Sequence, residues 1–552
     1  MTDPDELQPE IPPEIPIRYW NALFYLAGEN NLAEECVFAL KGLKRARPVG
    51  ANNVYTYDLD DEVDAKVKVV AQLDASGLGG DELRYVLTRG DGDGILKTDE
   101  REKIDTTETS YRGVLKDFIS ESIIKYDLAR KYLVVLSGHG NGIISDFLSR
   151  DVETPDKLSI PKIQWVFDEV KHDLAAEFGS QAGEDFMVDI LGLDSCMMSM
   201  AEIAYELRHN VRYLVGAEGF EPNTGWPYEQ ILSAVLTNCQ ITPDVLAKVI
   251  VERYVNYYKD FLPAGRSVDQ SACDLSKCED LARAIKDLAN VLIKRIEEPK
   301  TMRSVVLAHW EAQSYKDDQY VDLYDFCDLL DRGSVEDPVN PTGSRVMRGF
   351  DVDEGKAEDL IRPACKKIKN ILRGDSINGE APNPANGMIL KSCYSGPAVQ
   401  YSYGLSVYFP WSKVVDTYKE LEFAKATNWE KFLLKYIDVT RRVKRPCPTA
   451  GENAEVVKGE LFFNPVIKNF DFLWTDNKNA PTYNRVLGNK VGSMKNPAID
   501  FVPCECPETE IPDYDAQPQD PQGTQEAQRT PEAVEDPTTA PGDRSSTSTL
   551  KS

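Results

Sequence analysis

Short, nearly uninterrupted hydrophobic runs alternate with amphipathic segments through the first half of the chain. Because strands buried on both faces have continuous apolar sequences, these runs predict strands at 17–26, 67–73, 83–87, 131–137, 186–193 and 213–217. Amphipathic spacing predicts helices between them, from Leu32, over 111–126, after Ser159 and over 197–207. Strands that alternate with helices predict an α/β fold, a sandwich with a mostly parallel central sheet.

Changes in this pattern divide the chain into segments. An acidic, proline-rich leader covers 1–17, the alternating strands and helices cover 18–262, and a second mixed α/β part covers 263–445. A polar C-terminal extension covers 446–504. Residues 505–552 hold eleven acidic and three basic side chains among many Pro, Thr, Ser and Gln. Such a composition buries too little apolar surface to offset the entropy of ordering, so it predicts a disordered acidic tail.

Composition and charge exclude several classes of function. The 552 residues are 42% hydrophobic, enough for a sizeable core, and the net charge of -28 argues against broad binding to nucleic acid. No apolar stretch is long enough to span a membrane, and the N-terminus lacks the basic start and apolar core of a secretory signal. The eleven scattered cysteines, an odd number, favour reduced thiols. Together these features predict a cytoplasmic protein that binds neither nucleic acid nor membranes.

A histidine and a cysteine follow two of the predicted strands, at the sheet edge where α/β proteins place functional groups. His139 lies among glycines after the strand at 131–137, and Cys196 follows the strand at 186–193 at the predicted start of a helix. A helix N-terminus lowers the pKa of a thiol, and a histidine within reach serves as its general base. The backbone amides of Gly140 and Cys196 are candidate donors to an oxyanion. The pair therefore predicts nucleophilic catalysis by a His/Cys dyad.

Other interpretations of the same residues stay open. A lone cysteine at a strand end is usually a small buried hydrophobe, and a lone histidine is usually a hydrogen-bonded structural group. Gly138, Gly140 and Gly142 alternate after a strand, as in part of a dinucleotide-binding loop. The third glycine is misplaced for that loop, however, and no GxxxxGKS or GxxxxGKT phosphate loop occurs in the chain. The second alternative is a catalytically silent scaffold that recruits partners through its acidic tail.

Six short motifs occur in a fixed order: YLAGENNL from Tyr25, QLD from Gln72, SGHG from Ser137, LDSCMM from Leu193, GWPY from Gly225 and GLSVYFP from Gly404. Together they resemble the clostripain family of cysteine peptidases, which belongs with the caspases. The resemblance covers 19–436 and implies a caspase-like α/β/α sandwich with His139 and Cys196 as the dyad. It also implies an endopeptidase that cuts protein or peptide substrates after Arg or Lys, with Asp194 as the acid that pairs with the basic side chain.

Such a dyad requires no metal or cofactor. One feature departs from the family pattern: the chain has AEGFE over 217–221, where the family often has Ser-Gln-Glu-Thr, so the pocket wall differs. Residues 89–100 (RGDGDGILKTDE) place acids and a glycine at several positions of a calcium loop. Arginine occupies the first position of that loop, so a polar hairpin turn is the alternative to a Ca²⁺ site.

The polar loop between the two catalytic strands carries Arg150 and Lys157. Exposed polar loops are the usual sites of proteolytic nicking, so both residues are candidate processing sites for an enzyme that cuts after basic residues. The resemblance implies processing between the catalytic loops. We therefore expect a zymogen, activated by itself or by an upstream protease. The alternative is that both side chains are merely solvated charges.

Overall fold

The computed structural model describes most of the chain up to Arg441 and three short strands beyond it. The described residues are 18–50, 64–75, 81–88, 99–105, 111–126, 128–144, 147–148, 158–260, 267–316, 319–332, 360–374, 383–441, 460–464, 469–474 and 482–485. The chain divides into two compact units, Met1–Cys504 and Glu505–Ser552. The predicted leader and the predicted acidic tail lie outside the described residues.

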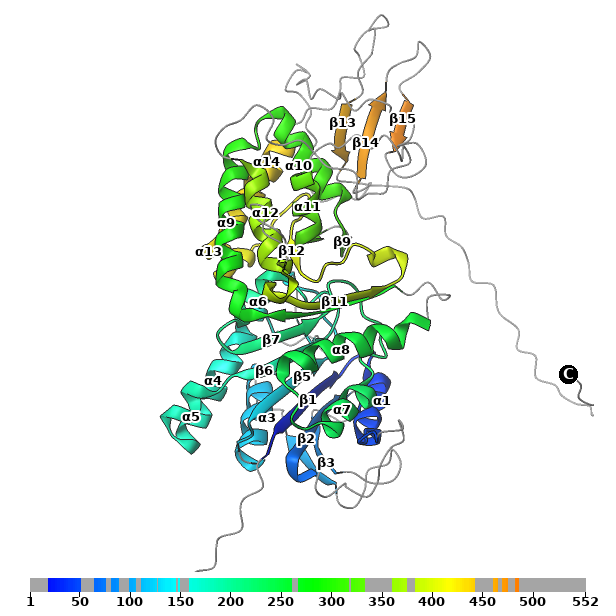
Figure 1. Cartoon of the computed structure of the whole chain (residues 1–552), viewed down its shortest axis with the longest axis vertical. Helices are drawn as coiled ribbons and strands as arrows, with labels where there is room; N and C mark the ends of the chain where they lie inside the picture. Colours follow the sequence, from blue (N-terminus) through cyan, green and yellow to red (C-terminus); the bar gives the residue numbers. More distant parts are fainter. Residues whose placement is uncertain are drawn as a thin grey trace, which may run out of the picture. The chain divides into compact units, whose positions relative to one another are not determined.

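A nine-stranded sheet with the order β11-β8-β7-β6-β5-β1-β2-β3-β4 forms the centre of the first unit (Figure 1). Its middle strands are parallel: β2 (Val67–Ala75), β1 (Trp20–Gly28), β5 (Lys131–Ser137), β6 (Val188–Asp194) and β7 (Val211–Gly216). Antiparallel strands extend both edges: β3 (Asp81–Leu87), β4 (Glu100–Asp105), β8 (Val268–Asp274) and β11 (Ile389–Ser395). The predicted α/β fold with a mostly parallel centre is confirmed, and strands from 263–445 complete the same sheet.

Helices cover both faces of the sheet because its middle strands are apolar on both sides. Along β1, Leu23 and Tyr25 belong to one hydrophobic core, whereas Phe24 and Leu26 belong to the other. The first core is closed by α3 (Tyr111–Tyr126), α4 (Ile160–Phe178) and α6 (Ala201–Leu207); a short α5 (Ser180–Asp185) follows α4. The second core is closed by α1 (Ala33–Arg45), α7 (Tyr228–Thr237) and α8 (Pro243–Tyr258) (Figure 1).

Further helices follow β8 in the chain and share the first hydrophobic core. They are α9 (Cys278–Arg295), α10 (Pro299–Glu311), α11 (Leu323–Arg332), α12 (Ile361–Arg373), α13 (Glu422–Thr427) and α14 (Trp429–Arg441). A small sheet accompanies them, in the order β12 (Ser406–Tyr408), β10 (Tyr320–Asp322) and β9 (Ser314–Tyr315). Helix α11 starts at Leu323, directly after β10, which pairs with strands on both sides.

The predicted polar extension contains a third sheet. Its strands are β13 (Glu460–Asn464), β14 (Asn469–Trp474) and β15 (Thr482–Arg485), which pair in antiparallel fashion. None of the helices in the described part of the chain has the length and apolar character needed to cross a membrane.

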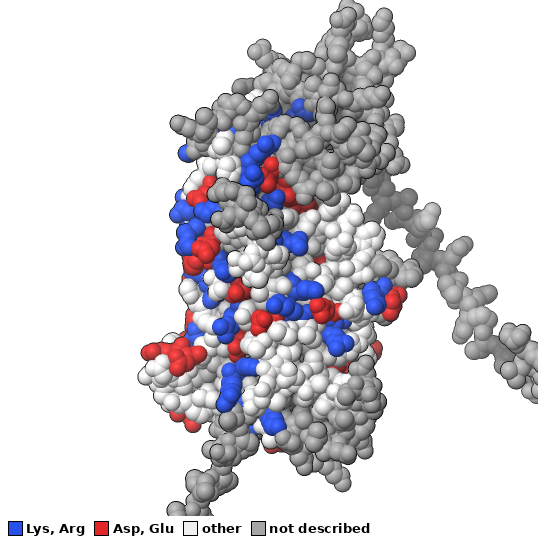
Figure 2. Space-filling model, in the orientation of Figure 1, with Lys and Arg blue, Asp and Glu red and all other residues white. Residues whose placement is uncertain are grey.

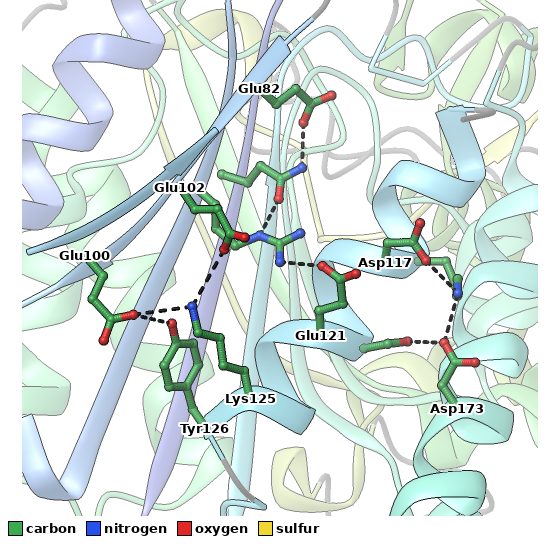
Figure 3. Close-up of polar contacts among 12 residues, drawn as sticks. Glu82, Glu100, Glu102, Asp117, Glu121, Lys125, Tyr126 and Asp173 are labelled. Carbon is green, nitrogen blue, oxygen red and sulfur yellow. Dashed lines mark hydrogen bonds and ion pairs between the residues drawn. The ribbon is translucent and has the colours of Figure 1, made fainter. Parts of the chain in front are cut away.

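Polar contacts fix α3 to the sheet (Figure 3). Arg84 of β3 donates to Glu121 of α3 at 2.7 Å and to Gln72 of β2 at 2.8 Å. Gln72 donates in turn to the buried Glu82 at 2.6 Å. Glu82 also accepts a hydrogen bond from the hydroxyl of Tyr25 at 3.0 Å. The chain of contacts satisfies polar groups that burial would otherwise penalise, and it holds β2, β3 and α3 in one register.

The same helix engages the last residue of the predicted calcium loop. Glu100 opens β4, and its carboxylate lies 3.4 Å from Lys125 and accepts from Tyr126 at 3.0 Å (Figure 3). Residues 89–98 lie outside the described part of the chain. Among the residues that are described, no group of three His, Cys, Asp or Glu is placed to hold a metal ion. The calcium site stays a prediction.

Acidic and basic side chains are interspersed over the described surface on the face shown in Figure 2. Neither sign gathers there into a broad patch, although the whole chain carries a net charge of -28. The eight cysteines within the described ranges are free thiols: Cys36, Cys196, Cys239, Cys273, Cys278, Cys327, Cys365 and Cys393.

Three buried carboxyl groups join the segment after β7 to the small sheet. Glu218 accepts the N–H of Gly404 at 2.7 Å, and Asp322 accepts the N–H of Tyr403 at 2.5 Å. Asp269 of β8 accepts the N–H of Glu218 at 2.8 Å. Burial raises the pKa of Asp269 to about 6 and that of Asp322 to about 7, and it raises the pKa of Glu218 well above its usual range. Glu218, once protonated, donates to Asp322.

These acids predict a fold that weakens as the pH rises. A carboxyl whose pKa is raised by folding stabilises the fold fully below its unfolded pKa of about 4. That contribution is lost as the pH rises through the folded value, about 7 for Asp322. We expect the melting temperature to fall between about pH 5 and about pH 8, and the Glu218→Gln variant to show a smaller fall. The exposed Glu177→Gln is the matched control, and an unchanged pH dependence in Glu218→Gln would contradict the prediction.

Candidate active site

The register of two parallel strands brings the predicted catalytic loops together. β5 pairs with β6 so that Ser137, the last residue of β5, lies opposite Asp194, the last residue of β6. Beyond them, the N–H of Gly138 donates to the carbonyl of Asp194 at 3.2 Å, and the hydroxyl of Ser195 donates to the carbonyl of Gly138 at 2.8 Å. The segments that carry His139 and Cys196 are therefore bound to each other directly.

Gly140 packs closely against the loop that carries Cys196. A Cβ atom at this position would lie 2.6 Å from the carbonyl oxygen of Cys196 and 2.8 Å from the Cβ of Ser195. Such distances are too short for any side chain, so glycine is required here for steric reasons. The contact puts the backbones of Gly140 and Cys196, the two predicted oxyanion donors, side by side. Their role as donors stays a prediction.

Asn31 orients the imidazole of His139. The Nε2 atom of His139 lies 2.6 Å from Oδ1 of Asn31, which belongs to the turn between β1 and α1. With the carboxamide oxygen facing the ring, Nε2 carries the proton and Nδ1 is the basic nitrogen. The turn is held by Asn30, whose side chain accepts from the N–H of Leu32 at 2.8 Å and donates to the carbonyl of Ala27 at 3.2 Å. Sequence reasoning gave Asn31 no catalytic role.

The environment of Cys196 differs from the predicted one. Helix α6 begins at Ala201, because Met197 has a left-handed φ of 60° and turns the chain directly after the cysteine. The prediction that a helix N-terminus lowers the pKa of this thiol is therefore wrong. Burial raises the pKa of Cys196, and Asp194 raises it further, whereas the N–H of Glu221, 3.3 Å from Sγ, acts in the opposite direction. The thiol is protonated in this state and needs a base.

Asp194 lies two residues before Cys196 and is 4% exposed. Its Oδ2 accepts from the hydroxyl of Ser137 at 2.8 Å and from that of Tyr228 at 2.5 Å. Gly225 covers it, since a Cβ there would lie 2.7 Å from Oδ2 and the φ of Gly225 is +66°. The GWPY motif thus supplies both a glycine that packs on the acid and a tyrosine that binds it. Because Tyr228 is part of the GWPY motif, this motif could have identified it from the sequence.

The predicted processing sites Arg150 and Lys157 lie outside the described residues. The residues that flank them are fixed beside the site. The N–H of Phe147 donates to the carbonyl of Leu158 at 2.9 Å, and the N–H of Leu148 donates to the carbonyl of His139 at 2.8 Å. The two ends of the connecting segment therefore meet next to the histidine loop.

His309 is a structural histidine. It is buried between the rings of Phe409 and Trp411, each stacked at 3.7 Å between centroids, and its Nδ1 lies 3.0 Å from the hydroxyl of Tyr436. Burial lowers the pKa of His309 well below its usual range, so the ring is neutral. Neutral packing of this kind explains the residue without catalysis.

Comparisons with known proteins found similar chains among cysteine peptidases. Clostripain of Hathewaya histolytica is 27% identical over 270 residues, which cover 40% of this chain and 47% of the relative. The chain thus spans about half the length of that curated relative. A secreted C11 cysteine protease from Bacteroides thetaiotaomicron, solved with an irreversible peptide inhibitor, matches with a TM-score of 0.49 and 17% identity, over 75% of this chain and 99% of that chain. An inactive zymogen C11 protease from Parabacteroides distasonis matches with a TM-score of 0.46 and 15% identity, over 74% and 98%.

The family model described as the clostripain family matches residues 48–342, more than half of the chain. This range includes the histidine loop, the cysteine loop and the GWPY motif, which the parallel sheet gathers at one edge. The resemblance seen in the six motifs is confirmed: the chain belongs to the clostripain family of cysteine peptidases.

Proposed function

We propose that this chain is a cysteine endopeptidase that cleaves peptide bonds after Arg or Lys, with Cys196 as nucleophile and His139 as general base. The observation that carries the proposal is the close approach of Gly140 to the backbone of Cys196 and the Cβ of Ser195, which brings the two predicted catalytic loops together. A scaffold without catalysis would have no need of a histidine whose ring is oriented by a third residue. Here Asn31 orients that ring at 2.6 Å.

The chemistry follows from the protonated state of the Cys196 thiol. Because burial raises the pKa of Cys196, the thiol gives up its proton only as it attacks, and Nδ1 of His139 receives it. The sulfur forms a bond to the scissile carbonyl carbon, and the oxygen that becomes negative is stabilised by the amides of Gly140 and Cys196. His139 then protonates the departing amine, and water releases the acyl group by the reverse sequence.

A preference for Arg or Lys rests on the acid behind the nucleophile. Asp194 sits where burial strengthens an ion pair, and a carboxylate binds a guanidinium through two hydrogen bonds or an ammonium through its charge. The hydroxyls of Ser137 and Tyr228 fix the direction of this carboxylate, so it does not need to reorganise when substrate binds.

Activation by cleavage is the regulatory part of the proposal. The segment that carries Arg150 and Lys157 starts and ends at residues bonded to each other and to the His139 loop. A cut inside it would release chain ends next to the general base, and the raised pKa of Cys196 is consistent with a thiol held unreactive in the intact chain. The cut is made by the protein itself or by an upstream protease.

The dyad is tested by single substitutions. Cys196→Ala and His139→Ala are each expected to remove nearly all hydrolysis of Arg and Lys peptides, because members of a catalytic unit act together. His309→Gln is a control outside the site and should retain cleavage wherever it folds. Substantial turnover in either dyad variant, measured with purified protein, would sink the proposal.

The role of Asn31 is tested by separating binding from catalysis. Asn31→Ala is expected to lower kcat by roughly ten- to a hundredfold with little change in KM, because the imidazole loses its orientation and substrate contacts are unchanged. Asn31→Asp keeps an oxygen acceptor for Nε2 and should recover part of the rate. Equal loss in both variants would show that Asn31 acts by other means.

Processing is tested by comparing intact masses. Purified wild-type protein is expected to yield two fragments cut within 149–157, and Cys196→Ala is expected to stay intact if the protein cuts itself. Cleavage of the Cys196→Ala chain by added wild-type enzyme would show that one molecule processes another. Full activity of an uncut chain with both Arg150 and Lys157 replaced would rule out this route of activation.

A further inference from the structure

Glu221 connects the nucleophile to the predicted specificity acid. Its N–H donates to Sγ of Cys196 at 3.3 Å, and its side chain forms a hydrogen bond with the carboxyl of Asp194. It lies in the segment between β7 and the GWPY motif, where the chain departs from the usual family sequence. Glu221 is therefore in contact both with Cys196 and with the acid to which the proposed function assigns the basic side chain.

The hydrogen bonds that the Glu221 side chain accepts from N–H donors involve only one of its two carboxyl oxygens. Oε1 accepts from Nε1 of Trp226 and from Nε2 of Gln270, each at 3.3 Å. Within the described residues, the buried Oε2 has no N–H or O–H donor. The side chain of Glu221 also forms a hydrogen bond with the carboxyl group of Asp194. Two carboxyl groups can form such a bond only when one of them is protonated.

Asp194 is arranged to be the acceptor in this contact. It already accepts hydrogen bonds from the hydroxyls of Ser137 and Tyr228 on Oδ2, so its carboxyl acts as an acceptor here. Glu221 receives only the two long contacts on Oε1, and burial together with the charge of Asp194 raises its pKa well above the usual range. The pattern of donors and acceptors therefore assigns the shared proton to Glu221.

We propose that Glu221 is a second specificity acid, which shares a proton with Asp194 in the free protein and releases it when a basic side chain binds between them. This inference rests on the proposed cleavage after Arg or Lys. A guanidinium presents several donors in a fixed plane, so it can replace the shared proton and bind both carboxylates at once. Binding of a neutral side chain of the same shape would leave the proton in place.

The other titratable groups around Glu221 and Asp194 do not contribute to the proton release. Those that act on this pair or face it are Cys36 of α1, Cys196, Tyr228 of α7, and Tyr254 and Tyr258 of α8. Burial raises the pKa of each of them, so all are neutral near pH 7 whether or not substrate is bound. Lys316 acts on the thiol of Cys196 and lowers its pKa, in the direction opposite to burial.

The test counts protons. Cys196→Ala protein is titrated calorimetrically at about pH 7 with an inhibitor-like peptide amide that has Arg at the position before the cleaved bond, in two buffers of different ionisation enthalpy. We expect close to one proton released per peptide bound. The same peptide with citrulline, the neutral isostere of arginine, should release none. The Cys196→Ala/Glu221→Gln protein should bind the Arg peptide about tenfold more weakly and release no proton.

Kinetics provide the second arm, with active enzyme. KM for an Arg peptide is expected to fall as the pH rises in the wild type, because the proton that competes with the substrate is lost, and to be flat in Glu221→Gln. Alkylation of Cys196 by iodoacetamide and an unchanged melting temperature verify that the isosteric variant is folded. The Asp194→Asn variant is the comparison. It should bind the Arg peptide more weakly and should also release no proton.

The outcomes separate the two proposals. If wild-type enzyme hydrolyses no peptide after Arg or Lys, the proposed function fails. If it hydrolyses them, but the Arg and citrulline peptides release equal numbers of protons or Glu221→Gln keeps the wild-type pH dependence of KM, then only the shared proton is wrong. Glu221 would in that case be a structural residue that holds Trp226 and the Cys196 loop.

Discussion

The pairing of β5 with β6 is the constraint on which the candidate site depends. Parallel strands in register end at the same sheet edge, so Ser137 opposite Asp194 fixes where both following loops begin. Two further hydrogen bonds then tie the loops together, from the N–H of Gly138 and from the hydroxyl of Ser195. His139 and Cys196 are thus positioned by hydrogen bonds of the neighbouring residues Gly138 and Ser195, and not only by contacts of their own side chains. Their proximity is a property of the sheet, which is buried on both faces and among the most rigid parts of the fold.

Exclusion of water determines the electrostatic state of everything behind the nucleophile. Burial raises the pKa of the Cys196 thiol, of Glu221 and of the acids that join the segment after β7 to the small sheet. Burial therefore favours the protonated, neutral form of each of these groups. The site therefore holds few unbalanced charges in spite of its many acids, and a bound cation would be the largest local charge. The same low dielectric that keeps the thiol protonated would strengthen an ion pair with substrate.

Much of this arrangement could be predicted from the sequence, for reasons visible in single elements. The continuous apolar run of β5 and the amphipathic spacing of α3 gave bounds that match the structure, because both elements bury their side chains within one core. Strand β8 was missed because its sequence, VDQSACD, is half polar; Gln270 and Ser271 are buried yet hydrogen-bonded. The start of α6 was misplaced because a non-glycine residue, Met197, has a positive φ.

The dyad loops could be found because a histidine among glycines and a cysteine after a strand are distinctive in the sequence itself. Asn31 and Glu221 could not, since their roles depend on partners 108 and 25 residues away. No local pattern shows that an asparagine in a turn after one strand will face a histidine after another. Such roles follow from tertiary contacts, which periodicity and composition do not encode.

The contact at Gly140 also limits how this protein could change by mutation. With the backbone of Cys196 2.6 Å from where a Cβ would stand, even the smallest side chain must separate the two loops. Most positions near a site allow activity to be adjusted in small steps through size or polarity. Position 140 allows no small step, because even alanine, the smallest replacement for glycine, adds a methyl group for which there is no space. If the proposed peptidase activity were no longer needed, a single codon change at Gly140 would be enough to remove it, with His139, Cys196 and the sheet beneath them all intact.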